Sequence, residues 1–304
     1  MTERRYMLIK STIFITAFLI GVIITAVIKK YSLRKNMLID KGISLAGGLG
    51  LGLSFIAICL IACFALGCPR AKLVGILSAS GVMLLFGLLD DFKELSIAQK
   101  FLTQVFAVFV LIFFGLRTHI VYIGVLANII ITLIWMLGII NAFNHLDVMD
   151  GLAGIVAIVI SFTFFAFAVF THNSNVMILS LALSGALAGF LIYNMPPAKV
   201  YMGNCGSHFL GFVLAITAIE ISYAPLNRKI ALFSPIIILG FPIFDMVFLM
   251  WMRIKKKRSV FKKSDDHLAL VFLKLGYSKT KILSLVFLLC LFFSACAILL
   301  TGLL

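Results

Sequence analysis

The sequence predicts an all-α, polytopic membrane protein of about ten transmembrane helices, with a site in cytoplasmic loops and helix ends. Three observations predict this class: 63% of the residues are hydrophobic, only 12% are charged, and the mean hydropathy is +1.19. A soluble domain carries about 25% charged residues. About 20 apolar residues in a helix cross the hydrocarbon core of a bilayer. The candidate runs are 7–28, 47–67, 73–89, 101–116, 120–140, 152–171, 176–193, 208–224, 231–251 and 281–303.

The connections between these runs are short, so we expect residues 1–304 to form a single membrane domain. The first run could be a signal peptide, but it is long, ends in Lys29 and Lys30, and has no small-residue cleavage site after it. We interpret it as a membrane helix. The six cysteines show no pairing pattern and mostly lie in apolar runs, which predicts small buried hydrophobic side chains.

The net charge is +15, from 26 basic and 11 acidic residues. In a soluble protein this charge would suggest nucleic acid. Here the basic residues lie at the ends of apolar runs, where membrane topology and anionic lipid head groups explain them, so we expect no nucleic-acid partner. With the N-terminus outside, most Lys and Arg residues fall in inward loops. The sequence therefore predicts a multi-pass protein of the inner (plasma) membrane with these loops in the cytoplasm.

Carboxylates are expensive near a bilayer, so their positions are informative. Most of the 11 acidic residues fall in the inward loops or at the helix ends beside them, although they come from distant parts of the sequence. Polar loop residues placed at random would occupy both faces. These residues are Asp40, Asp90, Asp91, Glu94, Asp147, Asp150, Asp265 and Asp266.

Paired carboxylates follow the third apolar run. Asp90 and Asp91 come directly after it. Adjacent carboxylates repel each other unless a cation neutralises them, and Mg²⁺ commonly binds one or two carboxylates together with phosphate oxygens. The alternative is that both aspartates only cap the next segment. The pair therefore predicts a magnesium site or a helix cap.

Polar residues recur every third position at the end of the fifth run, at Asn141, Asn144, Asp147 and Asp150. In a continuing helix each step turns by about 60°, so that neighbours in the series share a face. Hydrogen bonding between helices explains one Asn well, but it explains the whole series, which ends in Asp-Gly, poorly.

A glycine-rich segment precedes the eighth run. Gly203, Gly206 and Ser207 could present backbone N–H groups to a phosphate, and an ordinary tight turn is the alternative. His208 follows as a cap, a head-group contact or a catalytic residue.

The long inward loop is basic from Arg253 to Lys263. This run fits lipid head groups, and it would also attract a nucleotide diphosphate. Asp266 and His267 follow, before an apolar stretch that could lie along the membrane interface. For His267 the functional and the surface interpretations are equally supported.

In this order, the segments resemble the polyprenyl-phosphate N-acetylhexosamine-1-phosphate transferase family (glycosyltransferase family 4) over about residues 41–278. The order is more specific than any single motif. The matching segments are Lys41-Gly42-Ile43-Ser44 with Gly47-Gly48, Asp90-Asp91-Phe92-Lys93-Glu94, Asn141 to Gly154, Met202-Gly203-Asn204-Cys205-Gly206-Ser207, and Phe241-Pro242-Ile243-Phe244-Asp245.

The resemblance implies transfer of a sugar-1-phosphate, N-acetylglucosamine-1-phosphate in the most similar branch, from a UDP-sugar to polyprenyl (undecaprenyl) phosphate. The reaction releases UMP and starts cell-envelope polysaccharide synthesis. Implied partners are the UDP-sugar, the lipid phosphate, the membrane and, as an alternative to a monomer, a second copy in a homodimer. The implied catalytic residues are Asp90, Asp91, Asp150 and His267. The implied substrate-binding residues are Asn141, Asn144, Asp147, Lys100, Gly206 and Ser207. Asp91, Asp150 and Asn204 are the implied ligands of Mg²⁺, with Mn²⁺ as the alternative.

Two departures from the family pattern stand out. Asn204 replaces an aspartate associated with the metal, and a neutral amide oxygen is a weaker ligand for Mg²⁺. The late histidine motif is reduced to His267, which argues against the branch that transfers phospho-N-acetylmuramoyl-pentapeptide. A catalytically impaired member is therefore one alternative. A membrane transporter with Asp245 on its path is another, although a path needs polar residues through the whole bilayer depth.

Overall fold

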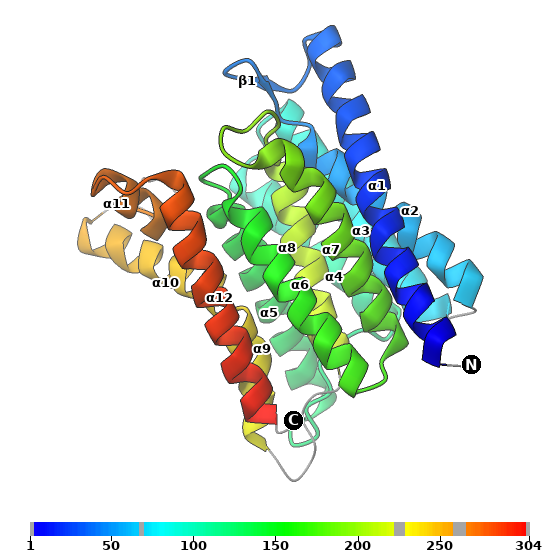
Figure 1. Cartoon of the computed structure of the whole chain (residues 1–304). Helices are drawn as coiled ribbons and strands as arrows, with labels where there is room; N and C mark the ends of the chain where they lie inside the picture. The colour runs from blue at the N-terminus through cyan, green and yellow to red at the C-terminus, as the bar shows by residue number, and fades with distance from the viewer. Residues whose placement is uncertain (1–2, 67–69, 222–228, 258–265, 302–304) are drawn as a thin grey trace.

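The computed structural model describes residues 3–66, 70–221, 229–257 and 266–301, and their regular structure is helical apart from one short hairpin (Figure 1). This confirms the predicted fold class. The elements are α1 (Glu3–Lys35), β1 (Ile39–Asp40), β2 (Ile43–Ser44), α2 (Gly47–Leu66), α3 (Arg70–Phe92), α4 (Ile97–Phe113), α5 (Val125–Leu146), α6 (Leu152–Phe170), α7 (Ser174–Asn194), α8 (Gly203–Glu220), η1 (Lys229–Phe233), α9 (Ser234–Ile238), α10 (Gly240–Lys255), α11 (Leu268–Lys274) and α12 (Lys279–Thr301).

Each predicted apolar run is helical over most of its described length, but fewer helices span a membrane by length and composition. Among the described residues, seven helices are long and apolar enough, or eight if the pair around Leu239, bent by 68°, is one span. Two helices explain the difference from about ten, one because it is short and one because its first turns are polar. α4 has only 17 residues, and the first turns of α8 carry Asn204, Ser207 and His208.

One helix starts later than predicted because a side chain captures the backbone before it. The fifth run was expected from residue 120, but α5 begins at Val125. The buried amide of Asn128 accepts a hydrogen bond from Ile120 N at 2.8 Å and donates to the carbonyls of Ile120 and Ile123 at 3.1 and 3.0 Å. These bonds hold residues 120–123 in a turn that cannot also be helical.

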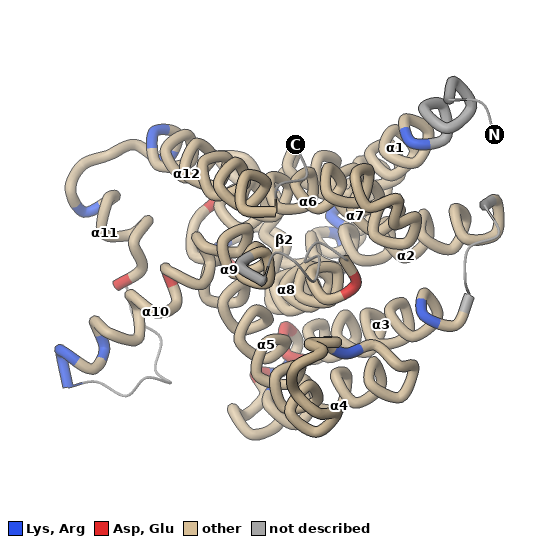
Figure 2. Tube along the Cα trace, turned by 90° about the horizontal axis from the view of Figure 1, so that it is seen from below, with Lys and Arg blue, Asp and Glu red and all other residues tan. Residues whose placement is uncertain are grey.

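α8 lies in the middle of the bundle (Figure 2), where it contacts α2, α3, α5, α6 and α7. Most of its side chains are buried. α10 and α11 lie beside this bundle, and Figures 1 and 2 agree on that position. The central helix therefore links the elements that carry the predicted site residues.

The start of α2 touches the start of α8 at two glycines. A Cβ atom added to Gly48 would lie 2.1 Å from Gly206 N and 2.3 Å from its Cα. The approach is fixed by the backbone, because Gly48 N donates to Met202 O at 2.9 Å and Gly47 N donates to Tyr201 O at 3.0 Å. Only glycine at both positions allows the two helices to meet this closely.

We therefore expect Gly48→Ala to destabilise the protein by about 1–3 kcal/mol or to prevent folding, because the added methyl group meets rigid backbone. Gly81→Ala is the matched control. Gly81 also lies inside a helix, and an added Cβ there would meet nothing within 4 Å. Thermal unfolding in detergent measures both variants. Equal midpoints for the two would contradict the tight contact between α2 and α8.

Candidate active site

The predicted loops meet at one end of the bundle, the upper end in Figure 1. Asp91 of α3 accepts hydrogen bonds from the backbone of Asn204. Asp150 contacts both Ala198 N and Lys279 Nζ. Segments that lie far apart in the sequence thus share one site, as their carboxylates indicated.

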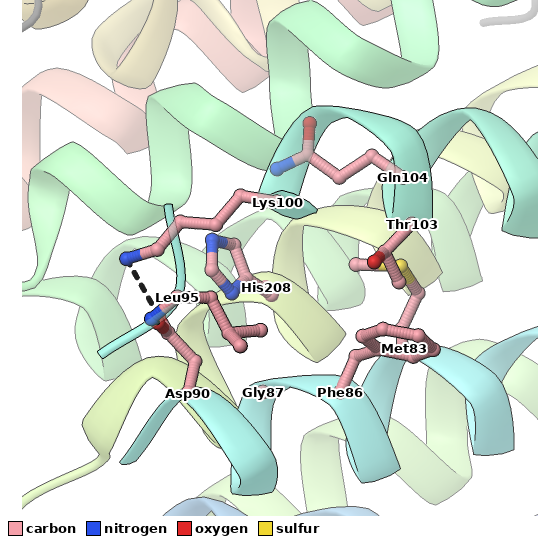
Figure 3. Close-up of a pocket in the computed structure, with 9 residues that line it drawn as sticks. All are labelled: Met83, Phe86, Gly87, Asp90, Leu95, Lys100, Thr103, Gln104 and His208. Atoms are coloured by element: carbon pink, nitrogen blue, oxygen red, sulfur yellow. Dashed lines mark hydrogen bonds and ion pairs between the residues drawn. The ribbon is translucent and has the colours of Figure 1, made fainter. Parts of the chain in front are cut away.

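Asp90 is buried at the end of α3 and paired with Lys100. Its Oδ2 lies 2.8 Å from Lys100 Nζ, and its Oδ1 accepts a hydrogen bond from Leu95 N at 2.8 Å. The pairing follows from the local structure. Ser96 and Gln99 form a capping box that starts α4, which places Lys100 in its first turn. A predicted catalytic residue and a predicted substrate-binding residue are therefore joined in an ion pair (Figure 3).

Asp91 holds the start of α8. Its two carboxylate oxygens accept hydrogen bonds from Asn204 N at 2.7 Å and Cys205 N at 2.9 Å. Gly203 has φ +69°, and a Cβ there would lie 2.7 Å from Asp91 Oδ2. The capping alternative was thus half right, because Asp91 caps a helix but not the one that follows it in the chain.

This arrangement gives two backbone groups of the glycine-rich segment a partner from the same chain. The backbone N–H groups of Asn204 and Cys205 already bind the Asp91 carboxylate. Gly206 packs against Gly48 in the helix contact described above. Ser207 is buried and donates to Asn144 Oδ1 at 2.9 Å. The substrate-binding roles of Gly206 and Ser207 stay predictions, and in this structure both residues join helices.

The periodic series at the end of α5 does not share a helical face, because the helix ends at Leu146. Asn141 bonds Gln104 of α4, with Nδ2 and Oε1 2.9 Å apart, so the interpretation as a bond between helices holds for it. Asp147 and Asp150 lie in the following turn, which ends at Gly151 with φ +76°. The condition for a shared face, a helix that continues through the series, is therefore not met at these two aspartates.

Asn194 supports this turn, and the sequence analysis did not single it out. It is buried, its Oδ1 accepts a hydrogen bond from Gly151 N at 3.0 Å, and its Nδ2 donates to Val200 O at 2.8 Å. Lys279 was missed as well, although its Nζ lies 2.7 Å from Asp150 Oδ2. The available signals were weak: an amide at the end of the seventh run and a lysine just before the last.

Asp147 is partly buried, and its pKa is raised to about 7. Burial is the main cause, and the negative charges of Asp91 and Asp150 add to it. These carboxylates therefore lie close enough to repel one another. A cation placed among them would lower the electrostatic energy of the site.

Hard oxygen donors of this kind suit Mg²⁺. Asp91 and Asp150 supply carboxylate oxygens near Asp147, and Asn204, whose backbone N–H binds Asp91, carries an amide oxygen. Both carboxylates already have protein partners, and within the described ranges no three His, Cys, Asp or Glu side chains are placed to hold a metal together. The donor chemistry thus fits the ion, and the ligand set stays a prediction.

His267 belongs to a second polar centre, with Asp245 of α10. Its Nδ1 lies 3.0 Å from Asp245 Oδ2, and Asp245 Oδ1 accepts a hydrogen bond from Leu268 N at 2.9 Å. Both side chains are buried. The His145 ring of α5 lies 6.1 Å from that of His267, centroid to centroid. Asp245 therefore binds His267 and the start of α11. In the transporter alternative, Asp245 would instead line a transport path.

Parts of the basic loop, including Asp265, lie outside the described residues, so the structure does not place them. At the edge of the described part, Lys256 and Asp266 form an ion pair.

We expect Asp147→Asn to stabilise the protein at neutral pH, because it removes the cost of ionising Asp147 in the folded state. The folded state binds this proton more tightly than the unfolded chain, so wild-type stability falls as pH rises from about 4 to about 7. The advantage of Asp147→Asn should grow over the same window, by about 2 kcal/mol after an allowance for partial exposure. Unfolding at several pH values in chelator measures it. An advantage that does not change with pH would contradict the shifted pKa.

The fold and the site define a polytopic membrane enzyme with its carboxylate centre at one end of a helix bundle. The model of glycosyl transferase family 4 matches residues 73–222, which include Asp90, Asp147 and Asn204. Over these residues the chain is similar to members of this family.

Three curated relatives illustrate the similarity. A probable undecaprenyl-phosphate N-acetylglucosaminyl 1-phosphate transferase of Bacillus subtilis is 29% identical over 94% of this chain and 84% of its own length. An undecaprenyl-phosphate alpha-N-acetylglucosaminyl 1-phosphate transferase of Thermotoga maritima is 32% identical over 65% of this chain and 61% of its own length. A phospho-N-acetylmuramoyl-pentapeptide-transferase of Lactococcus lactis is 32% identical over 44% of this chain and 46% of its own length.

Proposed function

We propose that the protein transfers a sugar-1-phosphate from a UDP-sugar to polyprenyl phosphate. N-acetylglucosamine-1-phosphate is the group that we favour. One observation carries the proposal: in a chain similar to members of this family, carboxylates from distant segments meet beside lysines at one end of the helix bundle. The names of the B. subtilis and T. maritima relatives support the choice of sugar and acceptor. The proposed reaction would begin cell-envelope polysaccharide synthesis.

In the proposed reaction, an oxygen of the lipid phosphate attacks the phosphorus that carries the sugar. The bond from that phosphorus to the bridging oxygen breaks, so the products are UMP and a lipid diphosphate sugar. A phosphate monoester is largely ionised at neutral pH and needs little deprotonation. Catalysis then consists mainly of alignment and neutralisation of charge.

The two centres fit different parts of this task. Lys100 and Lys279 are cations that can meet phosphate oxygens if they exchange their present partners, Asp90 and Asp150. Asp90, freed from Lys100, can orient the attacking phosphate. His267, held at Nδ1 by Asp245, has Nε2 as its other polar atom and can contact the diphosphate.

Mg²⁺ near Asp91, Asp147 and Asp150 would supply neutralisation of the phosphate charge. The protein's own residues arrange its surroundings: Asp91 is fixed by α8, Asp150 by Lys279, and Asn204 lies on the turn that Asp91 caps. We place this end of the bundle on the cytoplasmic side of a bacterial plasma membrane, because basic loops are expected on that side.

We expect Asp90→Asn, Asp91→Asn and Asp150→Asn each to lower turnover by at least about a hundredfold, the scale of losing a positioned charge. The assay uses purified protein in detergent with polyprenyl phosphate, Mg²⁺ and a panel of UDP-sugars, and it measures UMP release and the lipid product. Thermal unfolding separates loss of chemistry from loss of fold, above all for Asp91, which also caps α8. Wild-type turnover in all three variants would make the carboxylates structural.

Absence of transfer by the wild type with every UDP-sugar would instead favour the catalytically impaired alternative. Movement of substrate across proteoliposomes without UMP release would favour a transporter.

Asn204→Asp tests the metal site. A carboxylate there adds a charged ligand for a hard cation, so apparent Mg²⁺ affinity should rise. The same charge adds repulsion beside Asp91 when no ion is bound, so stability in chelator should fall. A Mg²⁺ titration of UMP release and thermal unfolding in chelator measure the two effects. If neither changes, Asn204 lies away from the ion.

A further inference from the structure

His208 is a buried polar residue that the roles proposed above do not use. It lies on α8 and is only 4% exposed. Among the residues that the structure describes, its Nε2 atom has no hydrogen-bond partner. Leaving a buried polar atom without a partner costs about 1–3 kcal/mol, and in native proteins such an atom commonly marks a functional or solvent-filled position.

The imidazole of His208 lines a small cavity between α3, α4 and α8 (Figure 3). Its volume is about 10 Å³, which is about one water-sized sphere. The cavity can therefore take one oxygen atom or the end of a neighbouring side chain, but not a substrate group. The lining residues are Met83, Phe86, Gly87, Asp90, Leu95, Lys100, Thr103, Gln104 and His208.

Most other polar groups of the cavity already have partners. Asp90 accepts from Leu95 N, the Thr103 hydroxyl donates to Gln99 O at 2.8 Å, and Gln104 pairs with Asn141. Lys100 differs, because its ammonium lies 2.8 Å from Asp90 Oδ2 as an ion pair and has three N–H groups to donate. Lys100 is thus the cationic donor that shares the cavity with the unpartnered nitrogen.

His208 is set up to accept such a bond. A neutral imidazole has one N–H and one lone pair, so when its N–H lies on Nδ1 the buried Nε2 carries the lone pair. This atom can therefore receive a proton donor such as an ammonium or a water, but not an ionised phosphate oxygen.

We propose that His208 is a positioning residue for Lys100: its Nε2 accepts a hydrogen bond from the Lys100 ammonium, directly or through one water in the cavity. Asp90 and His208 then hold the ammonium from two elements, α3 and α8. His208 keeps Lys100 in place when Asp90 exchanges it for a substrate oxygen. What Lys100 does for substrate rests on the proposed function, whereas the link between the two side chains does not.

A double-mutant cycle tests the link with wild type, His208→Phe, Lys100→Met and the double variant. Phe keeps the ring shape without the acceptor, so kcat/KM for UMP release should fall about tenfold. In the Lys100→Met background the same change should cost almost nothing further. His208→Gln returns an acceptor and should stay within about threefold of wild type.

Thr217→Val is the matched control. Thr217 is buried on the same helix and bonds Val213 O, and its loss should leave kcat/KM unchanged. Equal losses from His208→Phe in both backgrounds, or a Gln variant as poor as the Phe variant, would overturn the proposal.

Thermal unfolding of the same four proteins provides a second readout that needs no activity. The effects of His208→Phe and Lys100→Met on the unfolding midpoint should be less than additive, because each removes the same hydrogen bond. Lys100→Gln replaces Lys100→Met if the latter does not fold. A wild type without transfer activity would overturn the proposed function, and the unfolding cycle would still decide the link. Strictly additive midpoints would then overturn it.

Discussion

The structure depends on one interaction: the Asp91 carboxylate accepts hydrogen bonds from the first backbone N–H groups of α8. The first N–H groups of a helix have no partner inside it, and α8 is buried among five other helices. A negative charge at this end satisfies them and matches the helix dipole. The contact joins α3 to α8, fixes the turn at Gly203, and so presents Met202 O to the start of α2.

A second constraint is that three carboxylates of the two polar centres pair with side chains from different segments. Asp90 pairs with Lys100 of α4, Asp150 with Lys279 of α12, and Asp245 with His267 before α11. Such pairs are costly to break singly, because the remaining charge would be buried alone. The site therefore assembles only when the whole bundle is folded.

The sequence predicted the helical class and the shared end of the loops. Scarce carboxylates made this possible, because burial near a membrane leaves few positions where they are tolerated. Which partner each polar group takes could not be predicted. Periodicity placed Asp147 on a helical face, but α5 ends one residue earlier. The N–H groups of α8 suggested an anion, and the anion turned out to be Asp91 of the same chain.

Asp147 has no such pair among the described residues, and its position explains why the two polar centres form one continuous site. It follows the last turn of α5, where Asn144 bonds Ser207 of α8 and His145 lies beside His267. The end of α5 thus touches the carboxylate centre on one side and the Asp245–His267 centre on the other. Burial raises the pKa of Asp147, and the negative charges of Asp91 and Asp150 add to that shift. A ligand that brings positive charge to Asp147 and oxygens to Lys100, Lys279 and His267 would satisfy both centres at once, which is the charge pattern of a metal-bound diphosphate.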